Sequence, residues 1–262
     1  LSLLDAGKSL AQNVDEFFFV RKGKLSTEFE DLYASLFSNS ENYIKVVSAL
    51  STKNKGLTRK EIIDATGLAN SGDLTEILNN LDDCDIIRCY KGYGKQERMS
   101  MYQLCDFYSF FYFKFVKAHG NSNKEYWIHQ INTPTHNAWS GYAFEQLCLY
   151  HYNKIEQTLG INGIMTECYS WTSTSVEKGA QIDLVIKRAD KVVNICEMKF
   201  SQEPYVITKQ YWDNLQNKVA AFRAENKIRG PIQLVFVTAN GLASGKYASQ
   251  IYHQVRVEEL MG

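Results

Sequence analysis

Residues 179–199 read GAQIDLVIKRADKVVNICEMK and contain two apolar segments with a polar turn between them. The valines and isoleucines of both segments favour β-strands, so this stretch predicts a hairpin. Asp183 lies inside the first strand, and Glu197 and Lys199 lie two residues apart in the second. Side chains two apart on a strand share a face, so Glu197 and Lys199 should point the same way. Charges in such an apolar setting destabilise the fold unless they bind a partner or take part in chemistry, so these three residues indicate a functional site.

The composition indicates a globular protein without a preferred charged partner. The 262 residues are 45% hydrophobic, and 29 Lys and Arg balance 29 Asp and Glu, so nothing in the net charge favours nucleic acid or a membrane. No apolar run reaches the roughly 18 residues of a transmembrane helix, and the N-terminus does not resemble a signal peptide. The six cysteines contain no CxxC pair, which predicts reduced thiols in a cytoplasmic protein. Because the chain begins at Leu1, we expect a fragment of a longer protein.

Residues 1–37 show helical periodicity alone and are predicted to be a helical segment. Within them, Ala6-Gly7-Lys8-Ser9 looks like the end of a phosphate-binding loop. Ser2 stands where the upstream glycine of that loop is required, however, and no strand precedes it. An ordinary helix start capped around Asp5 is therefore expected.

Residues 38–106 follow a different plan, with three helical patterns followed by two strand patterns. Thr58-Arg59-Lys60-Glu61 is a capping box that starts the second helix. The third helix covers residues 73–81, and strands at 86–90 and 98–104 follow it. Three helices and a hairpin predict a winged helix-turn-helix domain.

The charges of this winged helix leave its partner open. Acidic residues between positions 73 and 83 occupy the helix that would read DNA, and phosphates would repel them. The basic residues Lys91, Lys95 and Arg98 lie in the wing and are candidate nucleic-acid contacts. A protein-binding or linker role for the same fold is the alternative.

Residues 107–136 are predicted to connect the winged helix to the last domain. Their first part, FYSFFYFKFV, is apolar around the whole helix. This is typical of a buried connecting helix, although a stacking platform for bases is conceivable. Polar residues and Pro134 follow, which indicates a linker.

The last domain, residues 137–262, is predicted to be an α/β domain with a mixed sheet. A helix over residues 139–154 carries Glu145, and three strands follow, of which the last two form the hairpin described above. A helix over 206–223 and a buried strand over 231–238 complete the order αβββαβ.

The spacing between Asp183 and Glu197-Met198-Lys199 resembles the signature of the PD-(D/E)xK nuclease-like superfamily, although Ile182 replaces the leading proline. Helical Glu145 resembles the additional acidic residue of many members. More broadly, the chain resembles the C-terminal region of bacterial and archaeal AAA-type ATPases with a nuclease-like tail. The matching segments in chain order are LYASLF (32–37), the winged helix, LCDFY (104–108), GYAFE (141–145) and QIDL (181–184). The resemblance implies a restriction-endonuclease-like fold and a preceding P-loop ATPase domain, the only place where ATP would bind.

The resemblance also implies DNA phosphodiester hydrolysis that depends on Mg²⁺ or Mn²⁺. A hard dication prefers carboxylate oxygens and water, and it lowers the pKa of a bound water. Asp183 and Glu197 are the expected ligands, with the Met198 carbonyl and Glu145 as further ones. Lys199 is expected to orient the water or to stabilise the developing charge.

Three further residues are candidate contacts to nucleic acid. Gln181 lies on the same strand face as Asp183, and Lys209 and Lys218 lie on the following helix, where they could contact backbone phosphates. The alternative is a non-catalytic tail that binds DNA or protein, in which the charges form an ordinary ion-pair cluster.

Overall fold

The computed structural model of the protein contains both strands predicted around Asp183 and Glu197. The structure describes residues 3–90, 100–120, 125–173 and 180–261. The described residues divide into two units, the first up to Ala138 and the second from Trp139 onward. Each unit has a β-sheet of its own.

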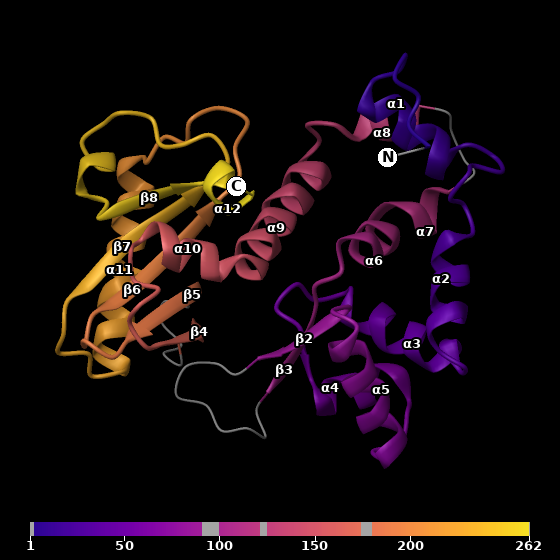
Figure 1. Ribbon diagram of the computed structural model, residues 1–262, viewed down its shortest axis with the longest axis horizontal. Helices are drawn as coiled ribbons and strands as arrows, with labels where there is room; N and C mark the ends of the chain where they lie inside the picture. The colour runs from indigo at the N-terminus through magenta and orange to yellow at the C-terminus, as the bar shows by residue number, and fades with distance from the viewer. Residues whose placement is uncertain (1–2, 91–99, 121–124, 174–179, 262) are drawn as a thin grey trace. The chain divides into compact units, whose positions relative to one another are not determined.

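The second unit is built on a five-stranded sheet with the order β4-β5-β6-β7-β8 (Figure 1). β4, β5 and β6 pair antiparallel, whereas β6, β7 and β8 pair in parallel. The predicted α/β architecture with a mixed sheet is therefore confirmed. β8 joins the sheet within residues 252–260, for which the sequence predicts a last helix or strand. The strands span Thr166–Thr172 (β4), Gln181–Arg188 (β5), Val193–Lys199 (β6), Ile232–Thr238 (β7) and His253–Arg256 (β8).

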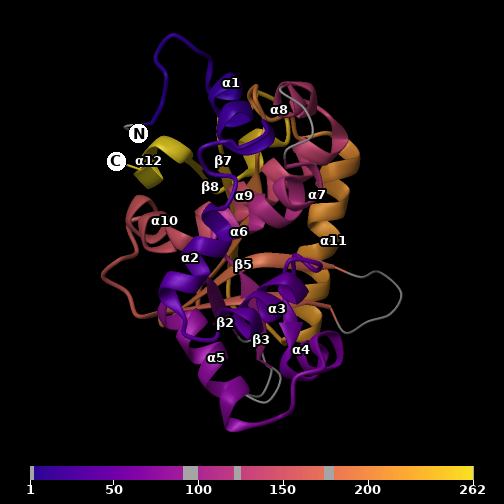
Figure 2. The ribbon, with the colours of Figure 1, turned by 90° about the vertical axis from the view of Figure 1, so that its right-hand side faces the viewer.

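Two long helices cover opposite faces of this sheet. α9 (Pro134–Tyr150) places Phe144 and Cys148 in one core cluster with even-numbered residues of β6. α11 (Lys209–Glu225), the long orange helix in Figure 2, places Phe222 in another cluster with odd-numbered residues of β6. Because side chains alternate along a strand, the predicted site residues of β6, both odd-numbered, face α11. The shorter helices of this unit are α10 (Tyr152–Thr158), η4 (Ala248–Gln250) and α12 (Val257–Met261).

The turn between β5 and β6 depends on two backbone features. Lys191 adopts a φ of +70°, and its N–H donates a 3.0 Å hydrogen bond to the Arg188 carbonyl, which closes the turn. Gly230 approaches so closely that a Cβ there would lie 2.1 Å from the Lys191 carbonyl oxygen. Only glycine fits this approach, so the loop before β7 holds the hairpin in place.

β5 contains a bulge at the position of Asp183. Trp171 of β4 pairs with Ile182, whereas Tyr169 pairs with Val185. β5 therefore has one more residue than β4 between the two pairs. Ile182 and Val185, although three residues apart, both belong to the core cluster on the α11 side. Bulges change the direction in which neighbouring side chains point, and this bulge lies at Asp183.

The first unit contains the helices and the two strands that the sequence predicts between residues 38 and 106 (Figure 2). Its sheet is antiparallel, with the order β1-β3-β2. The predicted wing residues Lys91, Lys95 and Arg98 lie outside the described residues. The elements span Ser40–Leu50 (α3), Leu57–Thr58 (β1), Arg59–Thr66 (α4), Gly72–Asp83 (α5), Ile87–Tyr90 (β2) and Met101–Leu104 (β3).

The aromatic segment after β3 is a core helix of the first unit. The Tyr112 ring stacks on Phe29 with centroids 3.9 Å apart, and the hydroxyls of Tyr33 and Ser109 share a 2.9 Å hydrogen bond. These contacts join the segment to α2, so its rings fill a core. No described helix, this one included, is long and apolar enough to cross a membrane. The elements concerned are α1 (Leu10–Val14), the π-helix η1 (Asp15–Phe19), α2 (Glu28–Leu36), α6 (Phe107–Phe111), the π-helix η3 (Tyr112–Val116) and α7 (Lys117–His119).

The first helix begins later than predicted. Its N-cap is Ser9, which forms a capping box with Gln12, and the expected cap at Asp5 is wrong. Asp5 instead accepts a 2.9 Å hydrogen bond from the Gly7 N–H. A serine followed three residues later by glutamine satisfies two N–H groups at once, which explains the start at residue 10.

The helix that carries Glu145 begins earlier than predicted. Pro134, interpreted as linker, is its first residue, and Thr133 accepts a 3.2 Å hydrogen bond from the His136 N–H. Proline is favoured at the first helical position, because its missing N–H would have no partner there. The helix also ends at Tyr150, and α8 (Tyr126–Gln130) lies within the predicted linker.

The predicted capping box at Thr58 is confirmed, and it leads to a pH-dependent prediction. Glu61 accepts hydrogen bonds of 2.7 Å from both Lys53 Nζ and the Thr58 N–H, which lower the pKa of Glu61 to about 2. We expect Glu61→Ala to lower the free energy of unfolding by about 1 kcal/mol at pH 7. Because the pKa is lower in the folded protein than in the unfolded chain, this contribution is full above the unfolded value and is lost as pH falls.

Thermal unfolding followed by circular dichroism between pH 6 and pH 2 tests this expectation. Glu61→Gln is the matched control, because glutamine keeps the capping hydrogen bond but does not titrate. The stability difference between the parent and Glu61→Gln should shrink toward pH 2. A difference that stays constant over this range contradicts the prediction.

Candidate functional site

The carboxylate of Glu197 is the centre of a charged cluster between β6 and α11. Its side chain is only 2% exposed. Lys199, two residues later on the same face, places its Nζ 3.1 Å from Glu197 Oε1. The predicted shared direction of these two side chains is thus confirmed, and the pair lies on the α11 side of the sheet.

α11 supplies two further partners for the same carboxylate. Lys218 Nζ lies 3.0 Å from Glu197 Oε2 and 3.3 Å from Oε1. The Tyr211 hydroxyl donates a short hydrogen bond to Oε1. Tyr211 and Lys218 are seven residues apart, which is two helical turns, and the buried Leu215 and Phe222 lie on the same stripe.

Asp183 approaches the cluster from the neighbouring strand β5. Gln181 Nε2 donates a 2.9 Å hydrogen bond to Asp183 Oδ1. Burial, followed by the negative charge of Glu197, raises the pKa of Asp183 above its ordinary value. The charges of Lys218 and Lys199 and the Gln181 hydrogen bond oppose this increase without cancelling it.

The pKa of Glu197 shifts in the opposite direction. Burial alone would raise it, but the charges of Lys199 and Lys218 and the Tyr211 hydrogen bond outweigh burial and lower the pKa. Burial would likewise lower the pKa of Lys199, yet the Glu197 charge raises it above the ordinary value. Burial and the nearby Glu197 raise the pKa of Tyr211. At neutral pH the cluster therefore holds an ionised Glu197, protonated Lys199 and a neutral Tyr211 that donates.

The two carboxylates suit a hard dication in ligand type, whereas the lysines beside Glu197 would compete with such an ion. The raised pKa of the half-buried Asp183 means that desolvation and the Glu197 charge disfavour its ionised form more than the surrounding cations favour it. Two carboxylates on adjacent strands are the ligand type that Mg²⁺ prefers, with water completing the shell. No three His, Cys, Asp or Glu side chains within the described ranges form a group that could hold a metal ion. The predicted set of Asp183, Glu197 and Glu145 is therefore not assembled as one group there.

The other predicted contacts have different surroundings. Gln181 and Lys218 lie in the cluster, where they bind the two carboxylates. Lys209 has a side chain that is 79% exposed, and its Nζ lies 3.0 Å from Asp213 Oδ2. Glu145 lies on α9, the helix that covers the sheet face opposite to α11.

Sequence reasoning missed the role of Tyr211. The apolar stripe of its helix predicts it as a packing residue, and its ring does lie edge-on to Phe236. Its hydroxyl nevertheless contacts Glu197. The available signal is the seven-residue spacing to Lys218, which puts a hydroxyl and an ammonium on one buried stripe.

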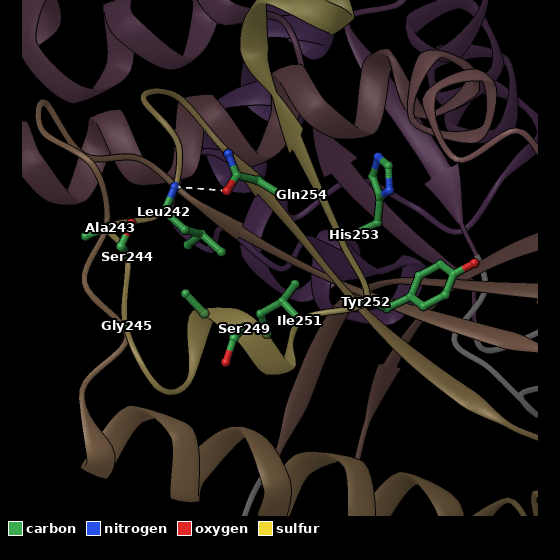
Figure 3. A pocket seen from close by; sticks show the side chains of 10 residues that line it. Leu242, Ala243, Ser244, Gly245, Ser249, Ile251, Tyr252, His253 and Gln254 are labelled. Carbon is green, nitrogen blue, oxygen red and sulfur yellow. Dashed lines mark hydrogen bonds between the residues drawn. The ribbon is translucent and has the colours of Figure 1, made fainter.

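A hollow of about 450 Å³ lies elsewhere in the second unit, in the loop between β7 and β8 (Figure 3). The Leu242 N–H donates a 3.2 Å hydrogen bond to Gln254 Oε1 across it. No Asp or Glu is among its lining residues, so the hollow offers no carboxylate chemistry. The charged cluster around Glu197 therefore remains the candidate site.

Comparisons with known proteins found no match for this chain. No family model matches the chain, and neither a curated protein nor a solved structure does so significantly.

Proposed function

We propose that the second unit is a PD-(D/E)xK nuclease-like domain that hydrolyses DNA phosphodiesters with Mg²⁺ or Mn²⁺. The observation that carries the proposal is the meeting of Asp183, Glu197 and Lys199 on two adjacent strands. Their opposed pKa shifts support it, because carboxylates pushed apart in pKa are common at functional sites. The order of the mixed sheet and its two covering helices is consistent with this fold.

The roles of the residues follow from their positions. Asp183 and Glu197 would hold the metal, with the Met198 carbonyl as a further ligand. The role of Glu145 as a fourth ligand remains a prediction. Bound there, the dication would supply charge neutralisation and a water of lowered pKa. Lys199, held protonated by Glu197, would stabilise negative charge that develops on the phosphate. The Gln181 hydrogen bond keeps the Asp183 carboxylate oriented.

We further propose that the first unit contains a winged helix and that the chain is the tail of an AAA-type ATPase. The three helices α3, α4 and α5 with the small sheet support the winged helix. Contacts to DNA through Lys91, Lys95, Arg98 and Lys209 belong to the same proposal. The ATPase domain would precede the chain, and ATP would bind there.

A non-catalytic role is the second candidate, and one observation favours it. Glu197 already has partners on both oxygens, and two lysines balance the two carboxylates. A site neutralised in this way can be a structural ion-pair cluster. The unit would then bind DNA or protein as a regulatory tail.

Nicking of supercoiled plasmid DNA in Mg²⁺ or Mn²⁺ distinguishes the nuclease from the non-catalytic tail. We expect the purified chain to nick the plasmid, and Asp183→Ala and Lys199→Ala to reduce the rate by at least about 100-fold. Lys187→Met is the control, since this lysine pairs with Glu167 at 3.1 Å on the exposed surface of the same sheet. Equal nicking by Lys199→Ala and the parent contradicts the site, and no metal-dependent nicking by the parent favours the regulatory tail.

A further inference from the structure

The Oε1 atom of the Glu197 carboxylate has no acceptor position left for a metal ion, and Oε2 is also contacted by one donor. A carboxylate offers about four lone-pair positions. Oε1 is contacted by the Tyr211 hydroxyl, by Lys199 Nζ at 3.1 Å and by Lys218 Nζ at 3.3 Å. Oε2 is contacted by Lys218 Nζ at 3.0 Å. A dication that binds both oxygens of this carboxylate must therefore displace a donor from Oε1.

Two of the three donors are held by additional contacts. The Tyr211 ring packs edge-on against Tyr205, with centroids 5.6 Å apart, and against Phe236 at 6.3 Å. Lys199 Nζ lies 5.2 Å from the centre of the Tyr211 ring, a cation–π contact that anchors it beside the tyrosine. Both donors therefore keep a partner other than Glu197.

Lys218 is the donor that can leave. It contacts both oxygens of Glu197, which is where a divalent ion would bind. Its side chain is 25% exposed and that of Lys199 is 31% exposed, so both ammonium groups can reach solvent, but Lys199 has the additional contact with the Tyr211 ring that holds it. A lysine has a flexible four-carbon stem and a strongly hydrated head, so it can move into water without a change in the helix.

We propose that Lys218 occupies the place of the metal on Glu197 and is displaced when a divalent ion binds. This inference rests on the proposed function and names the residue that sets the metal affinity of the site. The ammonium compensates the buried carboxylate while the metal is absent, so the fold does not depend on the ion. The metal must compete with this internal cation, which weakens its apparent affinity.

Calorimetric titration of the whole chain with Mn²⁺, without DNA, tests the proposal. We expect Lys218→Met to bind Mn²⁺ about tenfold more tightly than the parent, because methionine keeps the stem and removes the competing charge. Lys218→Arg keeps the charge and should keep the weak affinity. Lys187→Met is the matched control, because that paired lysine lies four residues along β5 from Asp183, or about 13 Å, and should leave the affinity unchanged.

The rise in unfolding temperature with Mn²⁺ gives a second reading of the same affinities and reports whether each variant is folded. A larger rise for Lys218→Met than for the parent supports the proposal. Equal Mn²⁺ affinity in both proteins overturns it and leaves the proposed function standing. Absence of Mn²⁺ binding by both overturns it together with the metal-dependent function. Binding by Lys218→Met alone supports it in its strongest form.

Discussion

Glu197→Ala is expected to lower the free energy of unfolding of the second unit by about 1–3 kcal/mol. The carboxylate is 2% exposed, and it compensates the ammonium groups of Lys199 and Lys218. Without Glu197, two partly exposed ammonium groups keep only Asp183 as a nearby counter-charge, so they lose most of their compensation within the protein. The Tyr211 hydroxyl loses its acceptor as well. This substitution should be among the most destabilising in the sheet.

Urea denaturation followed by tryptophan fluorescence measures the effect, since Trp171 lies in the core of this unit beside Phe222. Glu167→Ala is the control. Glu167 pairs with Lys187 at 3.1 Å, but its side chain is 55% exposed, so its loss should change stability by less than about 1 kcal/mol. Similar losses from Glu197→Ala and Glu167→Ala would show that the cluster is not a buried charge network.

A second substitution separates the uncompensated charge from the lost volume. If the stranded ammonium causes the loss, Lys218→Met in the Glu197→Ala background should restore part of the stability. In the parent, the same change removes a favourable partner of Glu197 and should lower stability. Opposite signs in the two backgrounds are the mark of a coupled pair. If Lys218→Met changes stability equally in both backgrounds, the stability lost in Glu197→Ala comes from packing alone.

The pairing of Glu197 with Lys199 could be predicted because it depends on a local period. Side chains alternate along any strand, and the valines and the isoleucine that precede Glu197 identify the strand. The hairpin, the helix α11 and the buried strand β7 follow from equally local patterns. These elements are present with ends shifted by a few residues at most.

The contact between α11 and Glu197 could be predicted only in part from the sequence. Lys218 lies three residues after Leu215 and four before Phe222, so helical spacing alone puts it on the buried stripe. Its predicted partner was a phosphate, whereas in the structure it binds Glu197. The partner depends on which strand of the sheet lies beneath the helix, and no local pattern contains that information.

The bulge in β5 illustrates the same limit at the scale of one residue. It arises from the offset between the Trp171–Ile182 and Tyr169–Val185 pairs, a property of two strands together. Neither sequence segment alone indicates the offset. The surroundings of Asp183 depend on this bulge and therefore required the structure.

Asp183→Asn is expected to act in the direction opposite to Glu197→Ala and to stabilise the metal-free protein by about 1 kcal/mol. Burial and the Glu197 charge raise the pKa of Asp183, so its ionised form is disfavoured in the folded state. Asparagine keeps the shape and can still accept the hydrogen bond from Gln181. Asp190→Asn is the control, because its carboxylate lies in the exposed turn with its pKa lowered by Arg188, and its loss should bring no stabilisation.

The pH dependence and the response to metal distinguish this expectation from a simple packing gain. A raised folded pKa means that the folded protein binds the Asp183 proton more tightly than the unfolded chain does. The parent should therefore lose stability relative to Asp183→Asn as pH rises through the folded pKa, and the two proteins should converge in acid.

Mn²⁺ should raise the unfolding temperature of the parent and not that of Asp183→Asn, because the same carboxylate that destabilises the empty site would bind the ion. A variant that is less stable than the parent at neutral pH, or that responds equally to Mn²⁺, contradicts the assignment of Asp183 as a metal ligand whose ionised form is disfavoured in the empty site. The opposite signs at Asp183 and Glu197 thus test one physical claim: in the absence of metal, Lys218 and Lys199 compensate Glu197 but leave Asp183 only partly compensated.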